Sequence, residues 1–145
     1  MESDIESRIQ RAVESLLENE AITSNLDDTQ ADIFLNWAKT RTQAIIRDTA
    51  GMDDLTAEET SYPRQKALRR FARYLNRVAA GDGDLSSTVQ QLIEQAQLIY
   101  QKPEVSITVE QANILAVEGQ DDPLAVFDFI VNLFEGEGKH GKEEI

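Results

Sequence analysis

Helix-start signals recur along this chain, and each is followed by apolar residues at the spacing of an α-helix. Ser3, with a glutamate three residues later, forms the first capping-box pattern, and Asp27 or Asp28 precedes the second apolar run. Asp84, or one of the two serines that soon follow it, precedes another run, and Thr108 precedes the next. The pattern therefore predicts helices throughout the chain.

Prolines and glycines suggest where these helices begin and end. Pro63 suits the first position of a helix over 63–80, with only a short turn after the capping pattern that begins at Thr56. Gly119 is expected to end the fifth helix, because glycine is common just past a helix C-terminus. Pro123 is expected to open the sixth helix.

One segment, EVSITVEQ at 104–111, alternates β-branched and polar residues as a strand would. No other segment offers a partner strand, so we expect an extended lead into the helix that Thr108 caps. The predicted fold class is all-α: a compact bundle of about six helices in one domain over 1–135, without a sheet. Residues 136–145 are predicted to form a flexible polar tail.

Length and residue content narrow the class of protein further. The 145 residues suffice for a domain that buries about two thirds of its unfolded surface. The chain has no cysteine, which excludes disulfides, thiolate metal sites and a cysteine nucleophile, and suits the cytoplasm. No stretch approaches the roughly 18 apolar residues of a membrane helix, so no membrane partner is predicted.

The formal net charge of −13, from 27 acidic and 14 basic residues, repels polyanions at long range and makes nucleic acid an unfavoured partner. Six of the cations nevertheless lie in the segment 62–80, which contains no acidic residue. Without these six, 8 basic residues face 27 acidic ones, a balance of −19. The segment is therefore strongly basic, whereas the rest of the chain is strongly acidic.

A helical projection places five of the six cations within an arc of about 100°, opposite an apolar side that holds Phe71 and Leu75. The five candidate partner-binding residues are Lys66, Arg69, Arg70, Arg73 and Arg77. One interpretation is a solvated face. The other is a docking face for an acidic protein, for a second copy of the chain, or for phosphates.

The last predicted helix, 123–134, is apolar around most of its circumference, with Asp128 and Asn132 on a narrow polar strip. It is expected either to be central in the core or to dock a partner with one side. Arg41 projects onto the apolar side of the second helix, where an arginine needs a carboxylate. Asp48 and Asp128 are the candidate partners for an ion pair.

Motifs for catalysis are scarce. His140, the one histidine, lies in the predicted tail, so neither histidine catalysis nor a multi-histidine metal site is predicted. The stretch from Asp82 has Ser87 and Ile93 where a calcium loop needs glycine and glutamate. No phosphate loop, nucleophile elbow or dinucleotide fingerprint occurs, and no cofactor is predicted.

Two hypotheses of function follow. The first is a non-catalytic protein–protein interaction or regulatory domain that docks through the basic helix (62–80), the apolar helix (123–134), or both. It could bind another protein or itself. The alternative is a magnesium-dependent hydrolase like the small all-helical nucleotide pyrophosphohydrolases, which hold magnesium with pairs of carboxylates at helical spacing. Candidate pairs are Glu14 with Glu18 and Glu118 with Asp121, although that family's spacing pattern is not reproduced.

Overall fold

Six α-helices make up the part of the chain that the computed structural model describes, which is residues 2–18 and 23–136, with side chains apart from those of 2–6, 16–18 and 54. They are α1 (Glu2–Glu18), α2 (Asp28–Asp48), α3 (Asp54–Ala80), α4 (Leu85–Tyr100), α5 (Val109–Asp121) and α6 (Pro123–Glu135). No strand occurs among these residues. The predicted all-α bundle of about six helices without a sheet is thus confirmed, while the tail predicted for 136–145 lies, except for Gly136, outside the described residues.

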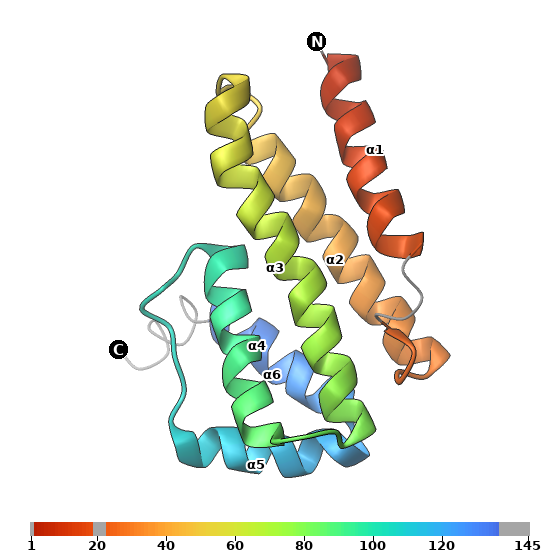
Figure 1. Cartoon of the computed structure of the whole chain (residues 1–145), viewed down its shortest axis with the longest axis vertical. Coiled ribbons are helices and arrows are strands. Elements are labelled where there is room, and N and C mark those ends of the chain that lie inside the picture. The colour runs from red at the N-terminus through yellow and green to blue at the C-terminus, as the bar shows by residue number, and fades with distance from the viewer. Residues whose placement is uncertain (1, 19–22, 137–145) are drawn as a thin grey trace.

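The helices α2 and α3 form a long antiparallel hairpin, and α1 lies beside the outer part of it (Figure 1). Helix α4 runs antiparallel to the second half of α3, and α6 packs behind these two (Figure 1). Helix α5 lies across the lower end of α3 and α4 (Figure 1). The second half of α3 is therefore covered on its inner side by α2, α4, α5 and α6, and its outer side faces solvent.

Four aromatic rings form the centre of the core. Phe34 and Trp37 come from α2, Phe71 from α3 and Phe127 from α6, and every pair of ring centroids is between 5.2 and 6.3 Å apart. Leu75 extends this core along the apolar side of α3 and is only 2% exposed. The projection of the basic segment therefore identified its buried side correctly.

Three predicted N-caps are present. The Asp27 side chain accepts the Gln30 N–H, and the Thr108 hydroxyl accepts the N–H of the residue three positions on, each within a capping box. The Asp84 side chain accepts the Ser87 N–H. The extended lead predicted before Thr108 also exists, since residues 105–108 belong to no helix or strand. In contrast, Ser3 does not start α1, because this helix already includes Glu2.

The break predicted before Pro63 is wrong. Helix α3 runs through Pro63 without interruption and begins at Asp54, where the side chain of the N-cap Asp53 accepts the N–H of Thr56 at 2.8 Å. Proline inside a helix removes one N–H donor, but Pro63 and Glu59, whose carbonyl loses that donor, are both exposed, so water can satisfy the carbonyl. Packing supplies the compensation, because the first turns of α3 bury Ala57, which is 1% exposed.

The helix end predicted at Gly119 is also wrong. Helix α5 continues to Asp121, and Gly119 is buried inside it. A Cβ atom at this position would lie 2.4 Å from Cγ1 of Val78 and 2.8 Å from Cγ2 of Val126. Gly119 is therefore required for the close approach of α5 to α3 and α6, and the sequence carries no sign of that contact.

Candidate partner-binding surface

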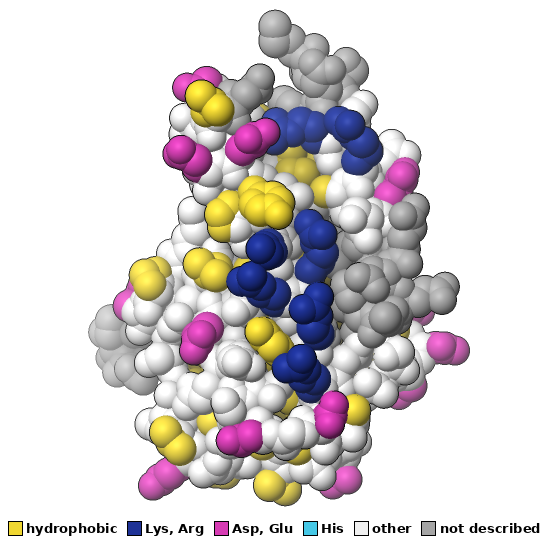
Figure 2. All heavy atoms as spheres, viewed as in Figure 1, with side chains coloured by type: hydrophobic (Ala, Val, Ile, Leu, Met, Phe, Trp, Pro, Cys, Tyr) yellow, Lys and Arg dark blue, Asp and Glu magenta, His cyan; other side chains and the backbone are white. Residues whose placement is uncertain are grey.

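The five cations singled out in the sequence lie together on the outer side of α3. Figure 2 shows them as a dark blue column along this helix. Lys66, Arg73 and Arg77 are exposed, while Arg69 and Arg70 are half-buried. Because α3 is one continuous helix, Lys66 and Arg77 are separated by about 16 Å along its axis. We call this set, Lys66, Arg69, Arg70, Arg73 and Arg77, the basic stripe.

The basic stripe has no carboxylate partner in the part of the chain that the structure describes. The ion pair found there joins Arg64 to Asp48, and no stripe residue has a carboxylate oxygen within 4.0 Å. Two stripe residues instead contact tyrosines on their own helix. The Lys66 Nζ lies 5.9 Å from the ring centroid of Tyr62, and the Arg77 Cζ lies 5.6 Å from that of Tyr74. Among the described residues, the stripe is thus a row of positive charges without a carboxylate partner.

Arg64, the sixth cation of the segment, has a structural role. Its side chain is buried, and its Nε and Nη2 donate to the carbonyl oxygen of Ile99 at 3.2 and 2.9 Å. Its Nη1 lies 3.6 Å from a carboxylate oxygen of Asp48. Burial lowers the pKa of Arg64, and Asp48 opposes that shift. Arg64 thus satisfies a carbonyl in the last turn of α4 and does not belong to the basic stripe.

An apolar end adjoins the basic stripe on the same face of α3. Leu55 is 76% exposed and Tyr62 is 58% exposed, and together with Glu58 and Glu59 they line an open groove of about 610 Å³. At about 100° per residue, Leu55, Tyr62 and Arg73 project within about 20° of one direction. The sequence interpretation missed this continuity, because it began the helix at Pro63 and so left Leu55 outside it.

Helix α6, the other predicted docking element, packs its apolar side chains into the core. Val126, Phe127, Ile130 and Phe134 are buried, and its remaining large apolar side chains are half-buried against the same core. The polar strip is exposed as predicted: Asp128 and Asn132 face solvent. Helix α6 therefore leaves no large exposed apolar side chain for a partner, whereas α3 does.

The ion pair predicted for Arg41 is wrong. Among the described residues, Asp48 pairs with Arg64 instead, and Asp128 is exposed without an ion pair. The Arg41 guanidinium carbon lies 5.4 Å from the centroid of the Tyr100 ring, so a cation–π contact replaces the carboxylate. Its Nε is buried and makes no hydrogen bond.

Tyr100 links three helices beside Arg41. Its hydroxyl accepts a hydrogen bond from the indole N–H of Trp37 at 2.9 Å and donates one to the carboxylate of Glu135. Burial, and secondly the bond to Glu135, raise the pKa of the Tyr100 hydroxyl well above its ordinary value. The group serves as a neutral connector between α2, α4 and α6.

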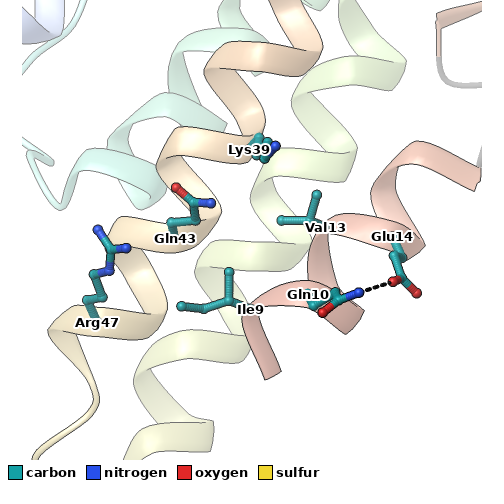
Figure 3. A pocket seen from close by; sticks show the side chains of 7 residues that line it. All are labelled: Ile9, Gln10, Val13, Glu14, Lys39, Gln43 and Arg47. Atoms are coloured by element: carbon teal, nitrogen blue, oxygen red, sulfur yellow. Dashed lines mark hydrogen bonds between the residues drawn. The ribbon is translucent and has the colours of Figure 1, made fainter. Parts of the chain in front are cut away.

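The carboxylates considered for a metal do not come together in the described residues. No three His, Cys, Asp or Glu side chains there form a group that could hold a metal ion. Glu118 and Asp121 are both exposed on α5 and do not face the interior. Glu14 lines a pocket of about 370 Å³ between α1 and α2 (Figure 3), where it accepts a hydrogen bond from Gln10 at 3.0 Å. The side chain of Glu18, its predicted partner, lies outside the described residues.

That pocket has a mixed lining. Ile9 and Val13 of α1 point toward α2, whose Lys39, Gln43 and Arg47 form the opposite wall (Figure 3). It offers one carboxylate and two cations, and no serine, threonine, cysteine or histidine is among its lining residues. The basic stripe therefore remains the best-defined candidate surface.

Comparisons with known proteins identify no relative of this chain. A scan against protein-family models, a search of curated proteins and a search of solved structures each found no match. Within the described residues, no helix has the length and apolar character needed to cross a membrane.

Proposed function

We propose that this chain is a non-catalytic interaction domain that binds an acidic protein surface through the basic stripe. One observation carries the proposal: five cations lie along the outer side of one helix with no carboxylate within 4.0 Å among the described residues, in a chain of net charge −13. Charges of one sign collected on a rigid surface steer and orient a partner of opposite sign.

The charge distribution favours a protein partner over nucleic acid. The net charge repels a long polyanion, and the Debye length of about 8 Å at physiological salt confines the attraction of the stripe to groups in near contact. The stripe extends about 16 Å, which matches a short acidic segment such as a few turns of helix. A local acidic partner therefore fits the stripe better than an extended phosphate backbone does.

The apolar end of the same face supports this proposal. Tyr62 offers exposed apolar surface next to Lys66, and Leu55 offers more about two turns further along the helix. Protein interfaces draw much of their affinity from such apolar or aromatic anchors, while rim charges contribute mainly to specificity and association rate. The expected partner thus carries acidic groups and at least one apolar side chain near one end.

The test is a nuclease-treated pull-down from cells that express the chain, with three versions of the bait. The first is wild type, and the second is R70E/R73E/R77E in the stripe. The third, R11E/K39E/R47E, reverses three exposed cations outside the stripe and therefore makes the same change in net charge. We expect a protein retained by wild type and by the third bait but lost with the second.

Two results would contradict the proposal. One is retention of the same proteins by the stripe variant, which would show that the stripe is only a solvated face. The other is equal loss of the partner in both variants, which would show that binding depends on the net charge of the bait and not on the position of the stripe. Circular dichroism of each bait shows whether it is folded. Reversal at the exposed sites, which are all of those changed except the half-buried Arg70, should change stability by about 0.5 kcal/mol per site or less.

A further inference from the structure

Helix α5 presents an unpartnered acidic and apolar face. Val109, Ile114 and Val117 are 66, 58 and 68% exposed, although α5 has only 13 residues. The sequence of α5 contains no lysine or arginine, and its three carboxylates, Glu110, Glu118 and Asp121, are exposed. The outer side of α5 thus combines large apolar side chains with negative charge.

This face and the outer face of α3 both expose large apolar side chains, and they carry charges of opposite sign. Eight large apolar side chains are exposed among the described residues, and five of them lie on these two helices. On α3, Tyr62 adjoins the basic stripe and Leu55 lies about two turns further from it, in the groove that Glu58 and Glu59 also line. On α5 they adjoin carboxylates. Helix α5 is about 20 Å long, close to the 16 Å or so of the stripe. Apolar surface and opposite charge could therefore be buried together.

The two faces cannot meet within one molecule. Gly119 fixes the inner side of α5 against Val78, near the C-terminal end of α3. Ile114 and Val117 project to the opposite side of α5 from Gly119 and are exposed, and separate magenta and yellow side chains lie at the lower end of the molecule in Figure 2. The stripe faces a different direction. The complement to the stripe must therefore come from a second molecule.

We infer that the acidic protein bound by the basic stripe is a second copy of this chain, which docks the outer face of its α5 along α3. The inference rests on the proposed function and names its partner. The two faces are different surfaces of one molecule, so the contact is heterologous, and each copy keeps one free face unless the arrangement closes on itself. Ile114 and Val117 then pack near Tyr62, and Glu118 and Asp121 lie against arginines of the stripe.

The test measures self-association of the purified full chain by sedimentation velocity at about 0.15 M salt, where long-range repulsion between acidic molecules is screened but contact pairs persist. The concentration is raised to about 500 µM, because a contact of two helix faces is small and expected to be weak. The first variant is R70E/R73E/R77E, and the second is E118K/D121K. The α5 pair is chosen because lysine near the C-terminal end of a helix is favourable for the helix dipole.

We expect wild type to shift toward higher mass with concentration, and either reversal alone to weaken association by about tenfold or more. Combining the two reversals restores opposite charges and should recover most of the wild-type association, which also shows that the variants are folded. I114S/V117S should weaken association without a change in charge. The control E94K/E104K makes the same charge change as the α5 variant, on exposed residues elsewhere, and should associate as wild type does.

Several outcomes would overturn the inference. The inference is wrong if wild type stays monomeric at every concentration, and it is also wrong if E94K/E104K loses association. If the stripe reversal abolishes association but the α5 reversal does not, α5 is not the docking element. If wild type retains a different protein in the pull-down and the stripe reversal loses it, the proposed function holds although the inference of self-association fails. The failure of the inference can therefore be distinguished from the failure of the proposed function.

Discussion

Replacing Gly119 by alanine tests the close packing of α5 on α3. Helix propensity alone predicts that alanine at a helical glycine stabilises by about 1 kcal/mol. The structure predicts the reverse, because the new methyl group would lie 2.4 Å from one branched side chain, that of Val78, and 2.8 Å from another, that of Val126. Neither methyl can move far, since the rotamer of valine in a helix is restricted.

The magnitude follows from these opposing effects. Overpacking in a core costs about 1–3 kcal/mol, and two such contacts favour the upper end. After subtraction of the propensity gain, G119A should destabilise by about 1–2 kcal/mol, which for a chain of this size lowers the Tm by about 3–6 °C. The assay is urea unfolding followed by far-UV circular dichroism and by the fluorescence of Trp37, the one tryptophan.

A double variant makes the test specific. In V78A the space beside Gly119 is opened, so adding G119A to V78A should cost at least about 1 kcal/mol less than adding it to wild type. A Cβ atom added at Gly51 would meet nothing within 4 Å, so G51A is the matched control and should be close to neutral. The reasoning fails if G119A stabilises the protein, or if its effect is the same in both backgrounds.

Three further changes test other contacts. L75A should cost about 2–5 kcal/mol in urea unfolding, because Leu75 is 2% exposed, and a loss below about 1 kcal/mol would contradict its place in the core. R64M should cost about 1–3 kcal/mol, because it removes both donors to the Ile99 carbonyl, with R64K in between; equal stability of R64M and wild type would show that the contact is dispensable. Y100F should cost about 1 kcal/mol at neutral pH, because the Trp37 N–H loses its acceptor. Since burial raises the pKa of Tyr100 above its ordinary 10.0, the neutral hydroxyl stabilises the fold fully below that pH, and this contribution is lost as the pH rises toward the folded value. Wild type should therefore lose more stability than Y100F above pH 10, and parallel pH curves would disprove the coupling.

Local chemistry explains what could be predicted from the sequence. Asp27, Asp84 and Thr108 were identified as caps because an N-cap satisfies backbone N–H groups only two or three residues away. The buried and exposed sides of the second half of α3 were also predictable, since the helical period alone places Phe71 opposite Arg73. The five residues of the basic stripe needed nothing beyond that period.

Contacts between distant segments decided the rest. Pro63 reads locally as a helix start, yet the packing of the hairpin extends α3 through it and so joins Leu55 and Tyr62 to the basic stripe. Gly119 reads locally as a helix end, yet it is the point where α5 meets Val78, 41 positions earlier in the sequence. The sequence by itself determined that the chain forms helices and which side of each helix is apolar, because capping and periodicity act within a few residues. Only the tertiary structure decided which faces stay open, because burial depends on neighbours that the chain brings together from far apart.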